Sequence, residues 1–292
     1  MLTLATSKIN HKNQRMITPG RITTLPIIAI DEKEIFLGTE EDKILLHPDD
    51  VQSNFEIGQQ LEVFVITTES GMKTGSRQLP TTQLNQASRQ RVLNMAPAGA
   101  YVDIGAVKHI LIPEEEMRDP LKDGQKVVMV LKYDFKNKKL YGSTRLGRYF
   151  PNNNINLQVG QQVNTIVGQK LPFGRKVVIN NMYTGIIFRK DIMRPMRIGD
   201  NYKLYVKEIS NEDITLVMQK IGEAGIDEGK QRIMDALENG SGYLRLNSNT
   251  DSEEIKIRLR ISKNTFKTAA TSLAKEGKVT LTKRGIKLIK KS

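Results

Sequence analysis

Short runs of alternating apolar and polar residues dominate the first 220 positions of the chain. In the run 100–104, Val102 faces one side of an extended chain and Tyr101 faces the other. Alternation with a period of two is typical of a β-strand that has one buried and one solvated face. Two more runs, at 127–133 and 140–144, are joined by a short polar turn, and this arrangement predicts a hairpin.

One pattern occurs three times, which indicates an internal repeat. A three-residue apolar strand is followed by a polar connection, then by an apolar residue, two further residues, a glycine and another strand. The three glycines are Gly58, Gly124 and Gly199. Each lies 12 positions after the end of its apolar strand, at Leu46, Ile112 and Ile187 respectively. A repeated unit of this size with five short strands matches a small OB-type barrel.

The apolar spacing becomes helical near the C-terminus. Phe266, Ala269, Ala270 and Leu273 recur at i, i+3, i+4 and i+7, which predicts an amphipathic helix over 263–276. Two earlier helices are expected, one from Asp227 to about 239 and one over 252–259, and a hairpin is expected over 278–289. Three helices followed by a hairpin are the order of a winged helix-turn-helix.

These patterns predict a mainly β protein with an α+β tail. The expected fold is three tandem five-stranded OB-fold barrels followed by a winged helix-turn-helix domain. The expected boundaries are an N-terminal arm at 1–18, barrels at 19–80, 81–150 and 155–220, and a winged-helix domain at 225–292. The stretch 150–154, Phe-Pro-Asn-Asn-Asn, is interpreted as a linker.

Charge is distributed unevenly over these units. The 292 residues carry a net charge of +13, which favours a polyanionic partner. Residues 17–80 hold 5 Lys+Arg and 11 Asp+Glu, a net charge of −6, whereas 81–150 (12 against 7) and 155–222 (10 against 5) each carry +5. Residues 225–292 (15 against 8) carry +7. A phosphate-binding surface is therefore expected on the last three domains and not on the first.

Sequence signatures of catalysis are missing from the chain. There is no phosphate-binding G-x-x-x-x-G-K-[ST] loop, no G-x-G-x-x-G after a strand and no H-E-x-x-H, and no hydrolase or nuclease constellation is recognisable. The three histidines, His11, His47 and His109, fall in different units and the chain has no cysteine. We expect no enzyme activity, no metal and no cofactor. The lack of cysteine fits a reducing cytoplasm, and no run is apolar enough to span a membrane.

Basic residues interleaved with aromatic ones are typical of a surface that binds single-stranded nucleic acid, because cations meet phosphates and flat rings meet bases. Such clusters occur at 172–176 and 188–190. The residues expected to contact single-stranded RNA are Tyr101, Lys132, Arg145, Phe173, Arg175, Lys176, Tyr183, Phe188, Arg189 and Lys190. The four aromatic residues would stack on bases and the cations would hold phosphates. The alternative is an ordinary solvated surface, with Tyr101 covering a barrel end.

The winged helix offers a second set of candidates, at the exposed start of its third helix and in its hairpin turn. They are Lys263, Asn264, Thr265, Lys267, Lys283 and Arg284. A recognition helix meets a DNA groove with such residues, although winged helices also dock proteins. Two alternatives to RNA binding therefore stay open. One is a duplex-DNA-binding transcription regulator, and the other is a ribosome- or polymerase-associated adaptor that docks through its acidic first barrel.

The chain resembles the conserved virulence factor B (CvfB) family, whose barrels are of the RNA-binding type named after small-subunit ribosomal protein S-one. The resemblance rests on Gly-Ala-Tyr-Val-Asp-Ile-Gly at 99–105, Ile-Leu-Ile-Pro at 110–113, and the residues 252–256 and 261–269 of the tail. It covers about residues 17–290, is strongest at the C-terminus and departs from the family pattern at 247–249. The resemblance implies a cytoplasmic, non-catalytic RNA-binding regulator of bacterial gene expression.

Overall fold

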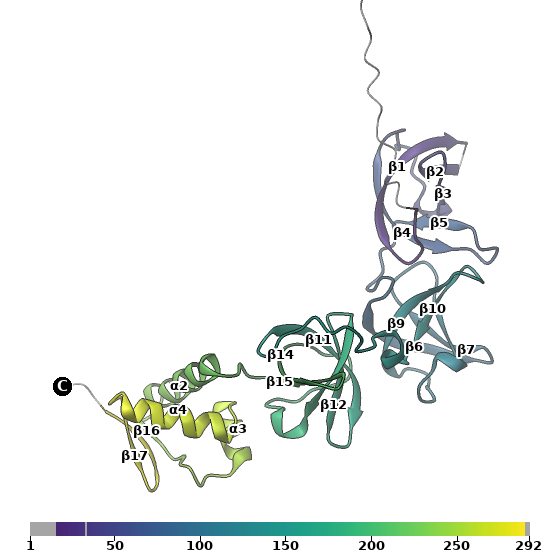
Figure 1. Cartoon of the computed structure of the whole chain (residues 1–292). Coiled ribbons are helices and arrows are strands. Elements are labelled where there is room, and N and C mark those ends of the chain that lie inside the picture. Colours follow the sequence, from purple (N-terminus) through teal and green to yellow (C-terminus); the bar gives the residue numbers. More distant parts are fainter. Residues whose placement is uncertain (1–15, 33, 290–292) are drawn as a thin grey trace, which may run out of the picture. The chain divides into compact units, whose positions relative to one another are not determined.

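The computed structural model describes residues 16–32 and 34–289 (Figure 1). Most of the expected N-terminal arm, including His11, lies outside the described residues. The described chain falls into two compact units. One comprises the described residues of 1–86, 93–114 and 131–142, and the other comprises those of 87–92, 115–130 and 143–292. Within the described ranges, no helix has both the length and the apolar character needed to cross a membrane.

Five strands form the first barrel. They are β1 (Ile22–Asp31), β2 (Glu34–Gly38), β3 (Lys43–Leu46), β4 (Gln60–Thr67) and β5 (Lys73–Ser76), in the closed order β1-β2-β3-β5-β4. The parallel pair β3–β5, with Leu45 opposite Thr74, completes the closure. Aliphatic side chains and Phe55 fill the interior.

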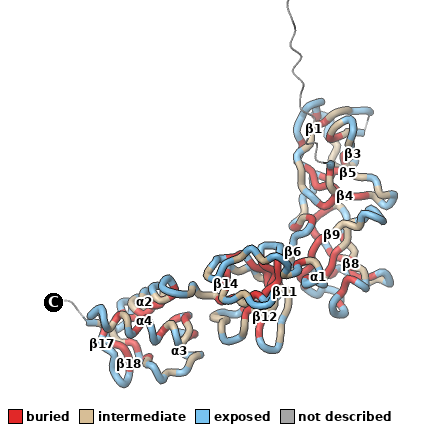
Figure 2. Tube along the Cα trace, in the orientation of Figure 1, coloured by how far each residue is buried: buried red, intermediate tan, exposed pale blue. Residues whose placement is uncertain are grey.

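The third barrel repeats this topology. Its strands are β11 (Gln162–Leu171), β12 (Gly174–Ile179), β13 (Tyr183–Phe188), β14 (Asn201–Ser210) and β15 (Asp213–Val217), in the closed order β11-β12-β13-β15-β14. The parallel pair is again between the third and fifth strands, with Ile186 opposite Thr215. Figure 2 shows buried residues along these strands, and they pack into one core cluster.

The second sheet differs from the expected closed barrel. Its strands are β6 (Ala87–Ala96), β7 (Gly99–Asp103), β8 (Ile110–Pro113), β9 (Lys126–Asp134) and β10 (Lys139–Ser143), in the open order β10-β9-β6-β7-β8. Instead of a ladder between β8 and β10, the short helix η2 (Glu114–Glu116) follows β8, and the Glu116 carbonyl accepts the N–H of Thr144 at 3.0 Å. The five expected strands are present, but they form an open sheet.

The repeated glycines have one structural role in all three copies. Gly58, Gly124 and Gly199 have φ values of +88°, +74° and +83°, a left-handed region that glycine enters without steric cost. Each N–H donates to a carbonyl of the first strand of its own copy. The acceptors are Ile27 at 2.8 Å, Val92 at 2.9 Å and Val167 at 2.7 Å. The equal spacing therefore reflects a turn that pins the fourth strand against the first.

The C-terminal region is a winged helix, as the sequence predicts. It consists of α2 (Glu223–Glu238), β16 (Tyr243–Leu244), α3 (Ser252–Leu259), α4 (Lys263–Lys275), β17 (Val279–Thr282) and β18 (Gly285–Leu288). The Ser262 hydroxyl accepts the N–H of Thr265 at 3.0 Å and caps α4. The predicted stripe of α4 is buried. The first helix begins at Glu223, four residues before the predicted cap Asp227.

The expected linker at 150–154 is not a free connection. Phe150 is 2% exposed and packs with Val128, Leu146, Ile166 and Val178 in one apolar cluster. It follows α1 (Leu146–Tyr149), a short helix directly after the second sheet. The cluster joins β9 to β11 and β12, so the start of this stretch holds parts of the second and third repeats together within one compact unit.

Candidate nucleic-acid interface

The outer face of the β12–β13 ladder carries a line of candidate residues. In this ladder Gly174 lies opposite Phe188, Lys176 opposite Ile186 and Val178 opposite Thr184. The intervening side chains, such as Val177 and Ile187, fill the barrel core. Because side chains alternate along a strand, the three opposed pairs share the other face.

Two aromatic rings lie at the end of this face that is next to the β11–β12 turn. Phe173 is 51% exposed, and its ring centroid is 5.9 Å from that of Phe188, with the ring planes at 38°. The Nζ atom of Lys190 lies 6.0 Å from the Phe188 centroid. Gly174 lets strand β12 lie close to strand β13, since a Cβ at this position would lie 2.2 Å from the Ile187 carbonyl oxygen. The result is a partly exposed aromatic pair beside a cation.

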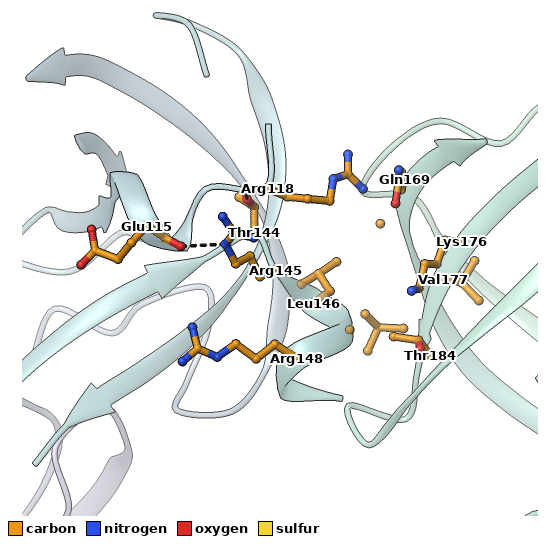
Figure 3. Close-up of a pocket in the computed structure, with 13 residues that line it drawn as sticks. Glu115, Arg118, Thr144, Arg145, Leu146, Arg148, Gln169, Lys176, Val177 and Thr184 are labelled. Atoms are coloured by element: carbon orange, nitrogen blue, oxygen red, sulfur yellow. Dashed lines mark hydrogen bonds between the residues drawn. The ribbon is translucent and has the colours of Figure 1, made fainter. Parts of the chain in front are cut away.

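A cavity of about 440 Å³ continues the same face (Figure 3). Its lining includes Lys176 and Thr184 of the β12–β13 ladder and three arginines from the segments after β8 and β10. These arginines are Arg118, Arg145 and Arg148. Glu115 also lines the cavity, but its carboxylate points away from Lys176 in Figure 3. The lining therefore contains four cations, of which Arg148 points its guanidinium away from Lys176 in Figure 3.

Hydrogen bonds hold the arginines of the cavity in place. Arg145 Nε donates to the Glu115 carbonyl at 2.7 Å. Arg148 donates to Oε1 of Glu116 at 2.9 Å, and the same oxygen accepts the Tyr149 hydroxyl at 2.8 Å. Glu116 is buried, and its other carboxylate oxygen has no partner among the described residues. A guanidinium has five donors, so these bonds orient Arg145 and Arg148 without using up their capacity to bind phosphate.

Two predicted contacts in the third barrel are placed differently from the expectation. Tyr183 is 5% exposed and lies in the barrel core, where its hydroxyl accepts the N–H of Asn156 at 3.1 Å. It cannot stack on a base. Arg175 donates to the carbonyls of Met196 and Gly174 at 3.1 and 2.9 Å and braces the barrel instead of facing outward. Strand parity could have indicated this, because Tyr183 and Arg175 have the alternation of core residues.

Arg189 is exposed, and one of its nitrogens donates to the Pro172 carbonyl at 2.7 Å, so it ties the Phe173 turn to the end of β13. Tyr101 and Lys132 lie in the other compact unit. Tyr101 is half-buried on the outer face of β7, as the buried Val102 predicts. Lys132 Nζ donates to Asn85 Oδ1 at 2.7 Å, and burial lowers the pKa of its ammonium.

The winged-helix candidates divide into exposed and occupied side chains. Asn264 and Lys267 on α4 and both turn residues, Lys283 and Arg284, are exposed, whereas Lys263 is half-buried. Thr265 is engaged in the first turn of α4, where its hydroxyl lies 2.8 Å from that of Ser262.

Two neighbouring residues hold the start of α4 and the β17–β18 turn in place. Gln219 accepts the Ser262 N–H at 3.2 Å and donates to the Arg260 carbonyl at 2.9 Å, so it holds the start of α4. Asn247, in the stretch that departs from the family pattern, donates to the Lys283 carbonyl at 3.0 Å. It therefore helps to fix the hairpin turn.

Two residues of the cavity, Arg118 and Arg148, were missed by sequence reasoning. Neither lies in a strand with a readable alternation, and Arg118 is 58 positions from Lys176. Only packing of the apolar cluster brings their segments to the third barrel. No group of three or more His, Asp or Glu side chains suited to a metal ion occurs within 16–32 and 34–289.

Comparison with known proteins identifies two parts of the chain. Residues 231–288 match the family model of the CvfB-like winged helix domain, and residues 19–71 match that of the S1 domain. Conserved virulence factor B of Staphylococcus epidermidis is 22% identical over 290 residues, covering 91% of this chain and 95% of that protein. The resemblance to the conserved virulence factor B family is confirmed. The uncharacterised protein YitL of Bacillus subtilis, 23% identical over 287 residues, is similar over 94% of this chain and 95% of its own length.

A solved structure also resembles this chain over most of its length. A multidomain protein with nucleic acid binding domains from Streptococcus pneumoniae is 21% identical, with a TM-score of 0.37, and covers 92% of this chain and 97% of its own. The S1 match falls on the acidic first barrel. S1 and winged-helix domains are nucleic-acid-binding families and not enzyme families, and the two matches support nucleic-acid binding by this chain.

Proposed function

We propose that this protein binds single-stranded RNA and acts, without catalysis, as a regulator of bacterial gene expression. The observation that carries the proposal is the continuous outer face of β12–β13. It leads from the Phe173–Phe188 pair past Lys176 to the cavity with Arg145. Bases would stack on the rings, and the backbone phosphates would meet the cations. We infer a cytoplasmic location, and the domain boundaries given above belong to the same proposal.

Three further sites would add contacts to RNA. Lys190 stands beside Phe188 and would hold a phosphate next to a stacked base. Tyr101 presents a partly exposed ring on the outer face of β7 and would stack a base separately. Asn264 and Lys267 of the winged helix would add contacts to a longer RNA.

The proposal is tested by fluorescence anisotropy of the full chain with a single-stranded RNA, the matching single-stranded DNA and the duplex DNA, each in a salt series. For a single strand, log K falls with log salt with a slope of about −0.7 for each phosphate neutralised. If the four cavity cations each neutralise one phosphate, they account for about −3 of that slope. RNA binding that is tighter than duplex binding and falls with salt is expected. Weak and equal binding of all three ligands would refute the proposal.

A second candidate function is duplex-DNA binding through the winged helix. The observation in its favour is that Asn264, Lys267 and Arg284 are exposed on α4 and in the hairpin turn. Lys267→Ala combined with Arg284→Ala should then remove duplex binding and leave RNA binding intact. The third alternative, an adaptor for a ribosome or polymerase, predicts that residues of the acidic first barrel govern association with such a particle.

A further inference from the structure

The tip of the β9–β10 hairpin carries an aromatic side chain that packing does not explain. Phe135 is 79% exposed, more than any other aromatic residue in the described part of the chain. Its ring lies edge-on to that of Tyr133, with centroids 5.0 Å apart and planes at 77°. Burying a phenylalanine side chain stabilises a fold, and the exposed Phe135 contributes little in this way. An exposed ring held beside a second ring is a ready surface for a flat partner.

The residues around Phe135 are mostly cationic. The segment 132–139 contains four lysines and one carboxylate, Asp134. The lysines are Lys132, Lys136, Lys138 and Lys139.

That carboxylate is used inside the turn. Asp134 accepts the N–H of Lys136 at 2.8 Å, the N–H of Asn137 at 3.2 Å and the Asn137 side-chain amide at 2.6 Å. The side-chain bond from Asn137 is the main cause of the lowered pKa of Asp134. Asp134 therefore stiffens the tip, and the segment 132–139 carries a net positive charge.

The first barrel braces this hairpin within the same compact unit. A Cβ at Gly71, in the β4–β5 turn, would lie 3.0 Å from Cδ of Lys138, so the Lys138 stem packs on that turn. On the other strand, Asn85 accepts from Lys132 Nζ at 2.7 Å and donates its N–H to the Leu131 carbonyl at 2.8 Å. Strand β9 and the turn of the hairpin are therefore both in contact with neighbouring residues of this unit, and these contacts support the segment that carries Phe135.

We propose that Phe135 is a second stacking site for single-stranded nucleic acid, with Lys136 and Lys139 contacting the flanking phosphates. This inference rests on the proposed function and adds a site to it in the other compact unit. A lone ring among lysines matches the combination of stacking and charge that binds single strands. Insertion into a lipid surface would need a broader apolar face, and the turn offers one apolar side chain among polar ones.

The absence of tryptophan from the chain allows a direct test. Three single variants each introduce one fluorophore: Phe135→Trp, Phe173→Trp at the site of the proposed function, and Ile257→Trp at a 78% exposed position of α3 as a control. Each full-length variant is titrated with single-stranded RNA and, separately, with anionic phosphatidylglycerol vesicles. Quenching by RNA in the Phe135 and Phe173 variants but not in the Ile257 variant is expected. Phe135→Ala should raise the Kd by about 5- to 150-fold.

The outcomes separate the two proposals. Quenching in the Phe173 variant alone would overturn the Phe135 site and leave the proposed function standing. Quenching in the Phe135 variant alone would support this site and place RNA binding away from β12–β13. If neither variant responds to RNA, both proposals fail. A blue shift of the Phe135 variant with vesicles, without quenching by RNA, would replace the stacking site with a lipid contact.

Discussion

Replacing Phe188 with leucine is the sharpest test of the stacking surface on the third barrel. Leucine keeps an apolar side chain on the outer face of β13, so the barrel core, which contains Ile187 and not Phe188, is untouched. The change removes one ring of the pair whose centroids lie 5.9 Å apart. Stacking of a base on an aromatic side chain contributes about 1–3 kcal/mol. At about 1.4 kcal/mol for each factor of ten, Phe188→Leu should raise the Kd for single-stranded RNA by about 5- to 150-fold.

The measurement is fluorescence anisotropy at one fixed salt concentration, because affinity for a polyanion depends steeply on salt. Tyr205→Leu is the matched control. It also replaces an aromatic residue of the third barrel, but on β14, which lies between β11 and β15 and not next to β13. The control should leave the Kd unchanged. An unaltered Kd for Phe188→Leu, with the melting temperature of the parent chain, would refute the assignment of this face.

Three further changes address the cavity, the fold and the winged helix. Lys176→Ala should lower the magnitude of the salt slope for RNA binding by about 0.7, the value for one phosphate on a single strand. An unchanged slope would show that Lys176 does not neutralise a phosphate of the RNA. Gly174→Ala should destabilise the third barrel by about 1–3 kcal/mol in urea unfolding, since its Cβ would lie 2.2 Å from a carbonyl oxygen of the facing strand. In the winged helix, Glu276 accepts hydrogen bonds from Lys230 and Lys278. These bonds, of which the one from Lys230 has the larger effect, lower the pKa of Glu276 from 4.5 to about 2. Because the folded pKa is depressed, this contribution to stability should be present above pH 4.5 and lost as the pH falls toward 2. Glu276→Gln should abolish that part of the pH dependence of thermal unfolding.

The sequence predicts local features of the fold well because they depend on short-range rules. Alternation of apolar residues located the strands, and the equal spacing of Gly58, Gly124 and Gly199 located a turn whose left-handed backbone only glycine adopts readily. Helix α3 begins and ends where it was predicted, and α4 begins at the predicted Lys263. The same rules could also have excluded Tyr183 from the surface, because it shares strand parity with the core residue Ile187.

By itself, the sequence determined the repeat, the strand faces, the winged-helix order and the opposite charges of the first barrel and the later domains. These follow from periodicity and composition, which act within one element or one domain. Tertiary structure alone decided that the second sheet stays open and that Phe150 lies in an apolar cluster. It also decided that Arg118 and Lys176 line one cavity. These features depend on how surfaces from distant segments pack together, and no spacing along the chain encodes that fit.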